Sequence, residues 1–218
     1  MKAADEITLA DEARLEENID LHVQRLQAVV QALVNCHARR VVDLGCGEGR
    51  LLERLLSNPQ FTDMIGLDAS QDALDSAGRR LKIDRMPAHR RRRIQLLHGS
   101  AIYRDTRLEG FDATAVIEVI EHLDLSSVAD FERAVFEFAH PRTVILTTPN
   151  SDYNVRWASL PAGNFRHSDH RFEWSRAEFE HWSSHVCGCF GYTVTTVPIG
   201  HNDPEVGAPT QMGIFTTN

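Results

Sequence analysis

Hydrophobic positions along the 218-residue chain alternate between helical and strand spacing through most of its length. Apolar residues between positions 11 and 35 recur at helical spacing and predict one or two leading helices. Short apolar runs predict seven strands, at residues 39–45, 61–68, 92–99, 111–119, 140–149, 192–200 and 210–217. Helical spacing predicts further helices at 48–58, 69–82, 126–139 and 174–187.

This alternation of strands and helices predicts one α/β fold, a mostly parallel seven-stranded sheet with helices on both faces. Residues 1–38 are expected to form a helical lead-in, and residues 39–218 the main domain. The segment at about 150–173 has no clear periodicity. Loops of this length in compact domains are usually functional or disordered, and its aromatic and charged residues argue against disorder. We therefore expect a functional insertion there.

Charge and hydropathy narrow the classes of function. The formal net charge is −8, which argues against a protein that coats the nucleic-acid backbone. The stretch 79–93 is locally basic, so it is either a solvated surface or a phosphate-contact patch. No apolar run approaches the roughly 20 residues of a membrane span, and the acidic start is unlike a signal peptide. We expect a cytoplasmic protein.

A glycine-rich turn follows the first predicted strand. In VVDLGCGEGRL, the residues Gly45, Gly47 and Gly49 precede a predicted helix. Ligands of open α/β sheets bind at such turns, where glycine lets the backbone approach closely. A dinucleotide-binding turn would be G-x-G-x-x-G, and Arg50 breaks that spacing, which weakens a NAD interpretation. Asp68 ends the second strand, where a carboxylate can accept both hydroxyls of a ribose.

Residues 39–150 resemble the Rossmann-like class I methyltransferases that use S-adenosylmethionine. In that family the glycine turn borders the methionine part of the cofactor, and an acidic residue after the second strand binds the ribose. Residues after the third strand lie near the adenine. The resemblance implies six cofactor-binding residues: Asp43, Gly45, Gly47, Asp68, Ser100 and Ala101.

Two clusters of potential metal ligands follow. The fourth strand runs into VIEVIEHLD, and Glu118, Glu121 and His122 would share one face if a helical turn began near Glu118. Such acidic residues can also merely shape a pocket. The stretch FRHSDHRFEW adds a histidine from the next loop, His167 or His170. Two carboxylates and two imidazoles suit Mn²⁺ or Mg²⁺ better than Zn²⁺.

Six segments together resemble the small-RNA 3′-terminal ribose 2′-O-methyltransferases, with the bacterial RNA-repair branch the most similar: VVDLGCGEG, GSAIYRD, FDATAVIEVIEHLD, TTPNSDYN, FRHSDHRFEW and DPEVGAPTQM. Members of this family transfer a methyl group from S-adenosylmethionine to RNA carrying a free 2′,3′-diol. One divalent ion chelates the two hydroxyls. Bacterial members also carry an amino-terminal module that partners a polynucleotide kinase–phosphatase–ligase, so such a partner is expected only for a longer form of the protein.

The resemblance implies roles for particular residues of this chain. Glu118, Glu121, His122 and His170 match the four metal ligands, with His167 as the second choice for the fourth. The predicted catalytic residues are Glu118, His167 and His170, and His167 would act as a base or orient the ribose. Two alternatives remain open at this stage. One is a metal-assisted O-methyltransferase of a small-molecule diol, and the other is a non-catalytic protein that binds RNA ends.

Overall fold

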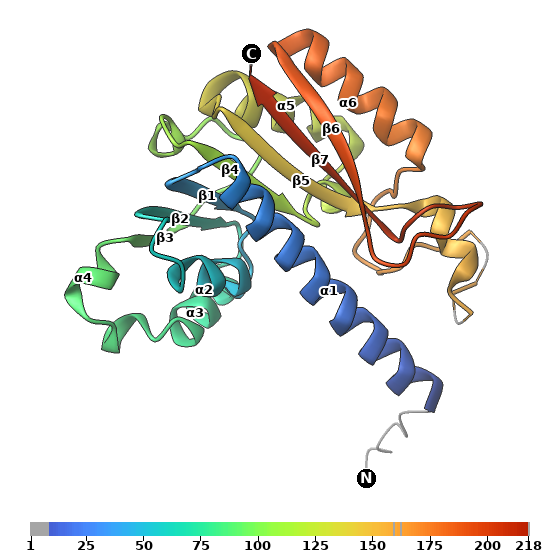
Figure 1. Cartoon of the computed structure of the whole chain (residues 1–218), viewed down its shortest axis with the longest axis horizontal. Coiled ribbons are helices and arrows are strands. Elements are labelled where there is room, and N and C mark those ends of the chain that lie inside the picture. The colour runs from blue at the N-terminus through green and yellow to red at the C-terminus, as the bar shows by residue number, and fades with distance from the viewer. Residues whose placement is uncertain (1–8, 159, 162, 218) are drawn as a thin grey trace.

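The computed structural model describes residues 9–158, 160–161 and 163–217. The first eight residues of the predicted lead-in, and residues 159 and 162 of the predicted insertion, lie outside this description. The described chain forms one seven-stranded sheet in the order β3-β2-β1-β4-β5-β7-β6 (Figure 1). Its strands are β1 (Arg40–Leu44), β2 (Asp63–Asp68), β3 (Ile94–His98), β4 (Ala113–Ile117), β5 (Thr143–Pro149), β6 (Tyr192–Ile199) and β7 (Thr210–Thr217).

The strand directions confirm the predicted mostly parallel sheet. The first five strands pair in parallel, and β7 is antiparallel to both of its neighbours. The α-helices are α1 (Leu9–Asn35), α2 (Arg50–Leu56), α3 (Gln71–Arg80), α4 (Ala88–Arg91), α5 (Val128–Glu132) and α6 (Arg176–Phe190). The helix predicted at 126–139 is present, but its second half, Arg133–Ala139, is π-helical.

Alternation along the strands divides the core into two layers. Val41 packs in a cluster with side chains of α1 and α2, whereas its neighbour Val42 packs with Phe131 and Phe179 on the other face. This period of two follows from the strand geometry. Helices therefore cover both faces, as the sequence predicts. The lead-in is a single long helix, α1, whose amino-terminal half extends away from the sheet (Figure 1).

Shorter helical turns fill most of the remaining connections. The 3₁₀ turns are Ile83–Arg85, Thr106–Leu108, Ile120–His122, Leu125–Ser127 and Ser151–Arg156. The last of these, η6 (Ser151–Arg156), begins the segment that lacks periodicity. Because the carboxyl ends of parallel strands meet at one edge, the segments after β1, β2, β4 and β5 all meet there.

The basic stretch 79–93 leads into β3, so it lies at the amino ends of the parallel strands, away from these segments. Several of its arginines have structural partners. Arg93 donates hydrogen bonds to the carbonyls of Asn58 and Phe61, and Arg91 donates to the carbonyl of Ile94. These contacts favour a structural role over a phosphate-contact patch. Among the described residues, no helix is both long and apolar enough to cross a membrane.

Candidate active site

The glycine turn, residues 45–49, is held open by backbone geometry. Gly45 and Gly47 have φ angles of 75° and 50°, in the left-handed region that glycine adopts without strain. The backbone N–H of Gly47 donates to Asp68 Oδ2 at 2.8 Å, and Ser70 N–H donates to Asp68 Oδ1 at 2.8 Å. Asp68 therefore ties the turn to the start of α3.

A cavity of about 230 Å³ opens against this turn. Its lining includes three of the predicted cofactor-binding residues, and Asp68, Ser100 and Ala101 are not part of it. The lining comes from α1, β1, the turn, the start of α2 and the end of β4: His22, Leu26, Asp43, Gly45, Cys46, Gly47, Glu48, Arg50, Leu51 and Ile117. We call it the cofactor cavity because it is the candidate cofactor site, and it adjoins the predicted ligand Glu118, which directly follows Ile117.

Asp43 is a buried acid in the wall of this cofactor cavity. Burial, with a contribution from the charge of Asp68, raises the pKa of Asp43 to about 7. Its Oδ2 atom has no hydrogen-bond partner among the described residues. A buried carboxylate oxygen without a donor is costly, so the site favours a ligand that brings a donor or a positive charge.

Gly45 also connects the turn to the metal-ligand segment. A Cβ atom at Gly45 would lie 2.4 Å from Val119 Cγ2, closer than real contacts allow. Only glycine permits this approach. The position of Val119, between Glu118 and Glu121, is thus set by packing directly on the glycine turn.

Three of the four predicted metal ligands come together. Within the described part of the chain, Glu121, His122 and His170 each offer a ligand atom, and these atoms lie within 4.8 Å of one another. The rings of His122 and His170 are 4.9 Å apart, centroid to centroid. Glu121 and His122 belong to the turn after β4, and His170 comes from the predicted insertion. The backbone joins the two segments, since Arg171 N–H donates to the carbonyl of Glu121 at 2.8 Å.

Glu118 lies outside this group of three. Its φ angle of 52° places it in the left-handed region, so the 3₁₀ turn begins only at Ile120. The expectation that Glu118, Glu121 and His122 share one helical face was therefore wrong. The carboxylate of Glu118 forms an ion pair with Arg25 of α1 at 2.5 Å and accepts a hydrogen bond from Thr147 Oγ1 at 2.9 Å.

A residue that the sequence analysis did not assign orients His170. His170 Nδ1 lies 2.6 Å from Glu173 Oε1, which leaves the other ring nitrogen for a ligand. In metal-binding histidines, the ring nitrogen that does not contact the metal usually donates a hydrogen bond to a carboxylate, a backbone carbonyl or water. Burial opposes ionisation of Glu173, but hydrogen bonds from His170, Asn154 and the backbone of Arg166 lower its pKa. The H-x-x-E spacing within FRHSDHRFEW was the signal that could have revealed this pair.

The donor set fits a divalent ion. Glu121 is fully buried, and its Oε1 atom has no hydrogen-bond partner among the described side chains and backbone. Its Oε2 atom accepts a hydrogen bond from Thr148 Oγ1 at 3.2 Å. Burial and the nearby charge of Glu118 raise the pKa of Glu121, and burial and His170 lower that of His122. A cation at the open carboxylate oxygen would offset the cost of burying an ionised Glu121, and the lowered pKa of His122 favours the neutral imidazole, the form that binds metals.

Among the remaining residues of FRHSDHRFEW, some are exposed and others have structural contacts. The imidazole of His167 is largely exposed, with its ring 6.3 Å from that of His122 and 5.8 Å from that of His170. Arg166 is half-buried, and its guanidinium donates to the carbonyl of Asn150, which favours a structural role. Phe172 is buried in the core.

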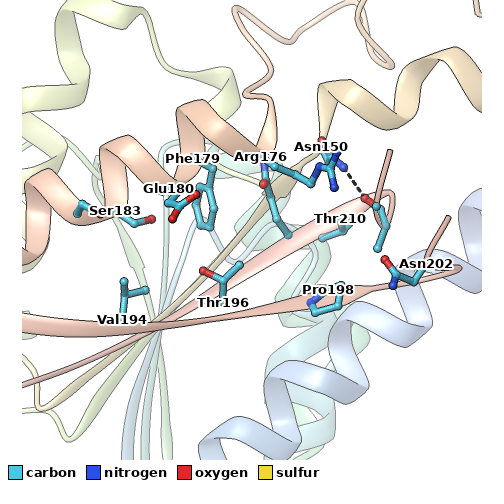
Figure 2. A pocket seen from close by; sticks show the side chains of 14 residues that line it. Asn150, Arg176, Phe179, Glu180, Ser183, Val194, Thr196, Pro198, Asn202 and Thr210 are labelled. Atoms are coloured by element: carbon cyan, nitrogen blue, oxygen red, sulfur yellow. Dashed lines mark hydrogen bonds between the residues drawn. The ribbon is translucent and has the colours of Figure 1, made fainter. Parts of the chain in front are cut away.

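Another cavity lies apart from these residues. Figure 2 shows it between α6 and β6, with a volume of about 490 Å³. Ser183 and Thr210 line it, and neither hydroxyl has a partner among the described residues. Glu121, His122 and His170 are not among its lining residues.

The sheet order, the glycine turn and the cavity beside it define a class I methyltransferase fold of the S-adenosylmethionine-dependent type. A family model described as a methyltransferase domain matches residues 42–145. A small RNA 2′-O-methyltransferase from Mus musculus is 38% identical over 205 residues, covering 91% of this chain and 51% of the relative.

Two solved structures are similar over nearly the whole chain. The methyltransferase domain of bacterial CtHen1 is 49% identical, with a TM-score of 0.83, and the match covers 90% of this chain and 99% of that one. The small RNA methyltransferase HEN1 is 30% identical, with a TM-score of 0.81, covering 91% of this chain and 26% of that one. The chain belongs to the small-RNA 2′-O-methyltransferase family, as a methyltransferase domain. It spans about half the length of the curated relatives that it matches.

Proposed function

We propose that the chain transfers a methyl group from S-adenosylmethionine to the 2′-hydroxyl of the 3′-terminal ribose of RNA, with one Mn²⁺ or Mg²⁺ ion. The observation that carries this proposal is the convergence of Glu121, His122 and His170 beside the cofactor cavity. Family membership supports an RNA substrate. A bound divalent ion supplies Lewis acidity, which lowers the pKa of a coordinated hydroxyl.

The protein's own residues position the reacting groups. The glycine turn and Asp43 are proposed to bind the methionine end of the cofactor, and Asp68, Ser100 and Ala101 its adenosine end. Glu121, His122 and His170 are proposed to hold the ion, with Glu173 fixing the ring of His170. Methyl transfer needs in-line alignment of nucleophile and methyl group, so this positioning supplies much of the rate.

Glu118 is proposed as the fourth metal ligand, which requires its carboxylate to exchange Arg25 for the ion. Its short ion pair with Arg25 supports an ionised carboxylate, the form that binds metals. His167 is proposed to orient the ribose or accept the proton of the 2′-hydroxyl. Its exposed ring beside His122 and His170 supports a role towards substrate.

The test is transfer of a tritiated methyl group to a short RNA with a free 2′,3′-diol, with and without Mn²⁺. We expect transfer only with the metal, and none to RNA ending in a 3′-phosphate or a 2′-deoxyribose. Transfer to small diols such as catechols, but not to RNA, would overturn the proposal. Activity that is insensitive to chelation would overturn its metal-dependent part.

A second part of the proposal concerns a longer form of the protein and its partner. The RNA-repair resemblance implies that a longer form would act with a polynucleotide kinase–phosphatase–ligase. Co-purification of that longer form with such a partner would test this. The single domain is expected to methylate RNA without it.

A further inference from the structure

A further cavity is lined in part by α1. It measures about 250 Å³ and is separate from both the cofactor cavity and the cavity of Figure 2. Three elements surround it: α1, the segment around η6, and the loop between β6 and β7. The lining residues are Asp20, Leu21, Gln24, Tyr153, Arg156, Trp157, Gly200, His201 and Pro209. We refer to it below as the α1–η6 cavity.

Two lining residues of the α1–η6 cavity are neighbours of arginines that contact the proposed metal site. Gln24 directly precedes Arg25, which pairs with Glu118. On the opposite side, the guanidinium of Arg166 lies over the Trp157 ring at 5.7 Å from its centroid. The backbone N–H of Arg166 donates to Glu173, the carboxylate that orients His170. Two lining residues, Gln24 and Trp157, are therefore neighbours of the arginines that contact Glu118 and Glu173.

Its walls are suited to a planar ring with polar edges. Tyr153 and Trp157 stand edge to face, with centroids 5.8 Å apart, and Leu21 and Pro209 add apolar surface. The indole Nε1 of Trp157 is buried and has no acceptor in the described part of the chain. Because this nitrogen has no accessible surface, the ring of Trp157 and not its N–H is available to a ligand in the cavity. The volume is smaller than the roughly 300–1,000 Å³ typical of drug-sized ligands.

Close backbone packing keeps this cavity formed. Gly200 has a φ angle of 97°, and a Cβ atom there would lie 2.5 Å from Pro209 Cγ and 3.0 Å from Leu21 Cδ1. The β6–β7 loop can approach α1 only because this position is glycine. Arg156 is held at the rim by Asp203 and Glu205. The walls thus come from three elements that the fold already fixes.

We infer that the α1–η6 cavity binds a nucleobase from the last two nucleotides of the RNA substrate. This inference rests on the proposed function and adds to it the site that holds a base. Proteins commonly bind single-stranded RNA ends by stacking splayed bases on aromatic side chains and contacting their polar edges. Trp157 and Tyr153 provide the aromatic surface, and Gln24 provides a polar contact.

The first test uses RNAs that lack a base. Removing the base of the last or the penultimate nucleotide leaves the diol intact, and one of these changes should raise the KM about 5- to 100-fold, as loss of one stacked base does. Equal KM values for both abasic RNAs and intact RNA would overturn the inference while leaving the proposed function standing. Failure to methylate any diol-ended RNA would instead end the proposed function, and the inference with it.

The second test does not depend on activity. RNAs with 2-aminopurine at the last or penultimate position should lose fluorescence on binding, because stacking on an indole quenches that base. Trp157→Phe keeps a ring and should weaken the quenching, and Trp157→Ala should remove it. Thermal unfolding establishes that each variant is folded. Val155→Ala is the matched control, since Val155 is exposed in the 3₁₀ turn that ends just before Trp157. Unchanged quenching in both Trp157 variants would contradict the inference.

Discussion

The glycine turn and the Glu121–His122–His170 group lie at the same edge of the sheet, but different contacts hold them. Backbone hydrogen bonds and left-handed glycines form the turn, and Asp68 is its main side-chain partner. The metal-ligand group depends on side chains from distant segments, including Thr148 and Glu173. The proposed cofactor region is therefore largely preformed, whereas in the proposed metal region Glu118 is paired with Arg25.

The largest expected effect follows from removing a proposed ligand. Glu121→Ala, His122→Ala or His170→Ala should each reduce methyl transfer about 1,000-fold or more, because each removes part of the proposed ion site. Binding of S-adenosylhomocysteine, measured by calorimetry, should change little, since the glycine turn is built independently. Near-normal transfer by His170→Ala would exclude His170 as a ligand.

Gly45→Ala should disturb both regions. The new Cβ atom would meet Val119 Cγ2 at 2.4 Å in a left-handed backbone conformation. We expect the free energy of unfolding to fall by roughly 2–4 kcal/mol, and cofactor affinity to fall with it. Urea unfolding and calorimetry measure the two effects.

The control for this change is Gly78→Ala. Gly78 lies inside α3, and a Cβ atom there would meet nothing within 4 Å. This substitution should stabilise the protein by about 0.5–1 kcal/mol through helix propensity. If the two variants were equally stable, the close contact of the turn with Val119 would have no energetic role.

Glu173→Ala should weaken Mn²⁺ binding about 10- to 100-fold, the effect typical of losing a carboxylate that orients a metal-binding histidine. Glu173→Gln retains an acceptor and should fall between wild type and Glu173→Ala. Asp169→Ala is the control, because the side chain of Asp169 is exposed. Calorimetric titration with Mn²⁺, with no cofactor present, gives the affinities. Equal affinities for Glu173→Ala and Asp169→Ala would remove the positioning role from Glu173.

The smallest effect concerns Arg25. Arg25→Gln should tighten Mn²⁺ binding roughly fivefold in the absence of cofactor, because it frees Glu118 and removes a nearby positive charge. Adding Glu118→Gln should abolish this gain if Glu118 is a ligand. Arg92→Gln, at an exposed position of the distant basic stretch, should have no effect. If the double variant still bound Mn²⁺ more tightly than wild type, Glu118 would not be a ligand. The ligands would then be Glu121, His122 and His170.

Local sequence patterns predicted most of the fold because the strands are buried apolar runs and the helices have clear periodicity. Predicted boundaries differ from the observed ones by up to about three residues, as between 140–149 and β5 (Thr143–Pro149). The π-helical end of the segment 126–139 has no simple periodic signal, and it was not predicted.

The sequence predicted which residues form the candidate site, but it did not predict how they are arranged in space. The sequence suggested helical spacing for Glu118, Glu121 and His122, and the left-handed backbone at Glu118 breaks that arrangement. The Arg25–Glu118 ion pair joins α1 to the end of β4, a contact that no local pattern reveals. Partners that are distant in sequence become visible only once the sheet has brought them together.

The position of α1 has a consequence for defining the smallest active unit. Its residues supply the counter-charge of Glu118 and form walls of both the cofactor cavity and the α1–η6 cavity. A fragment cut just before β1 would retain every strand, yet it would expose an unpaired carboxylate and open both cavities to water. Transferring this sheet to another protein would therefore transfer function only if α1 were transferred with it.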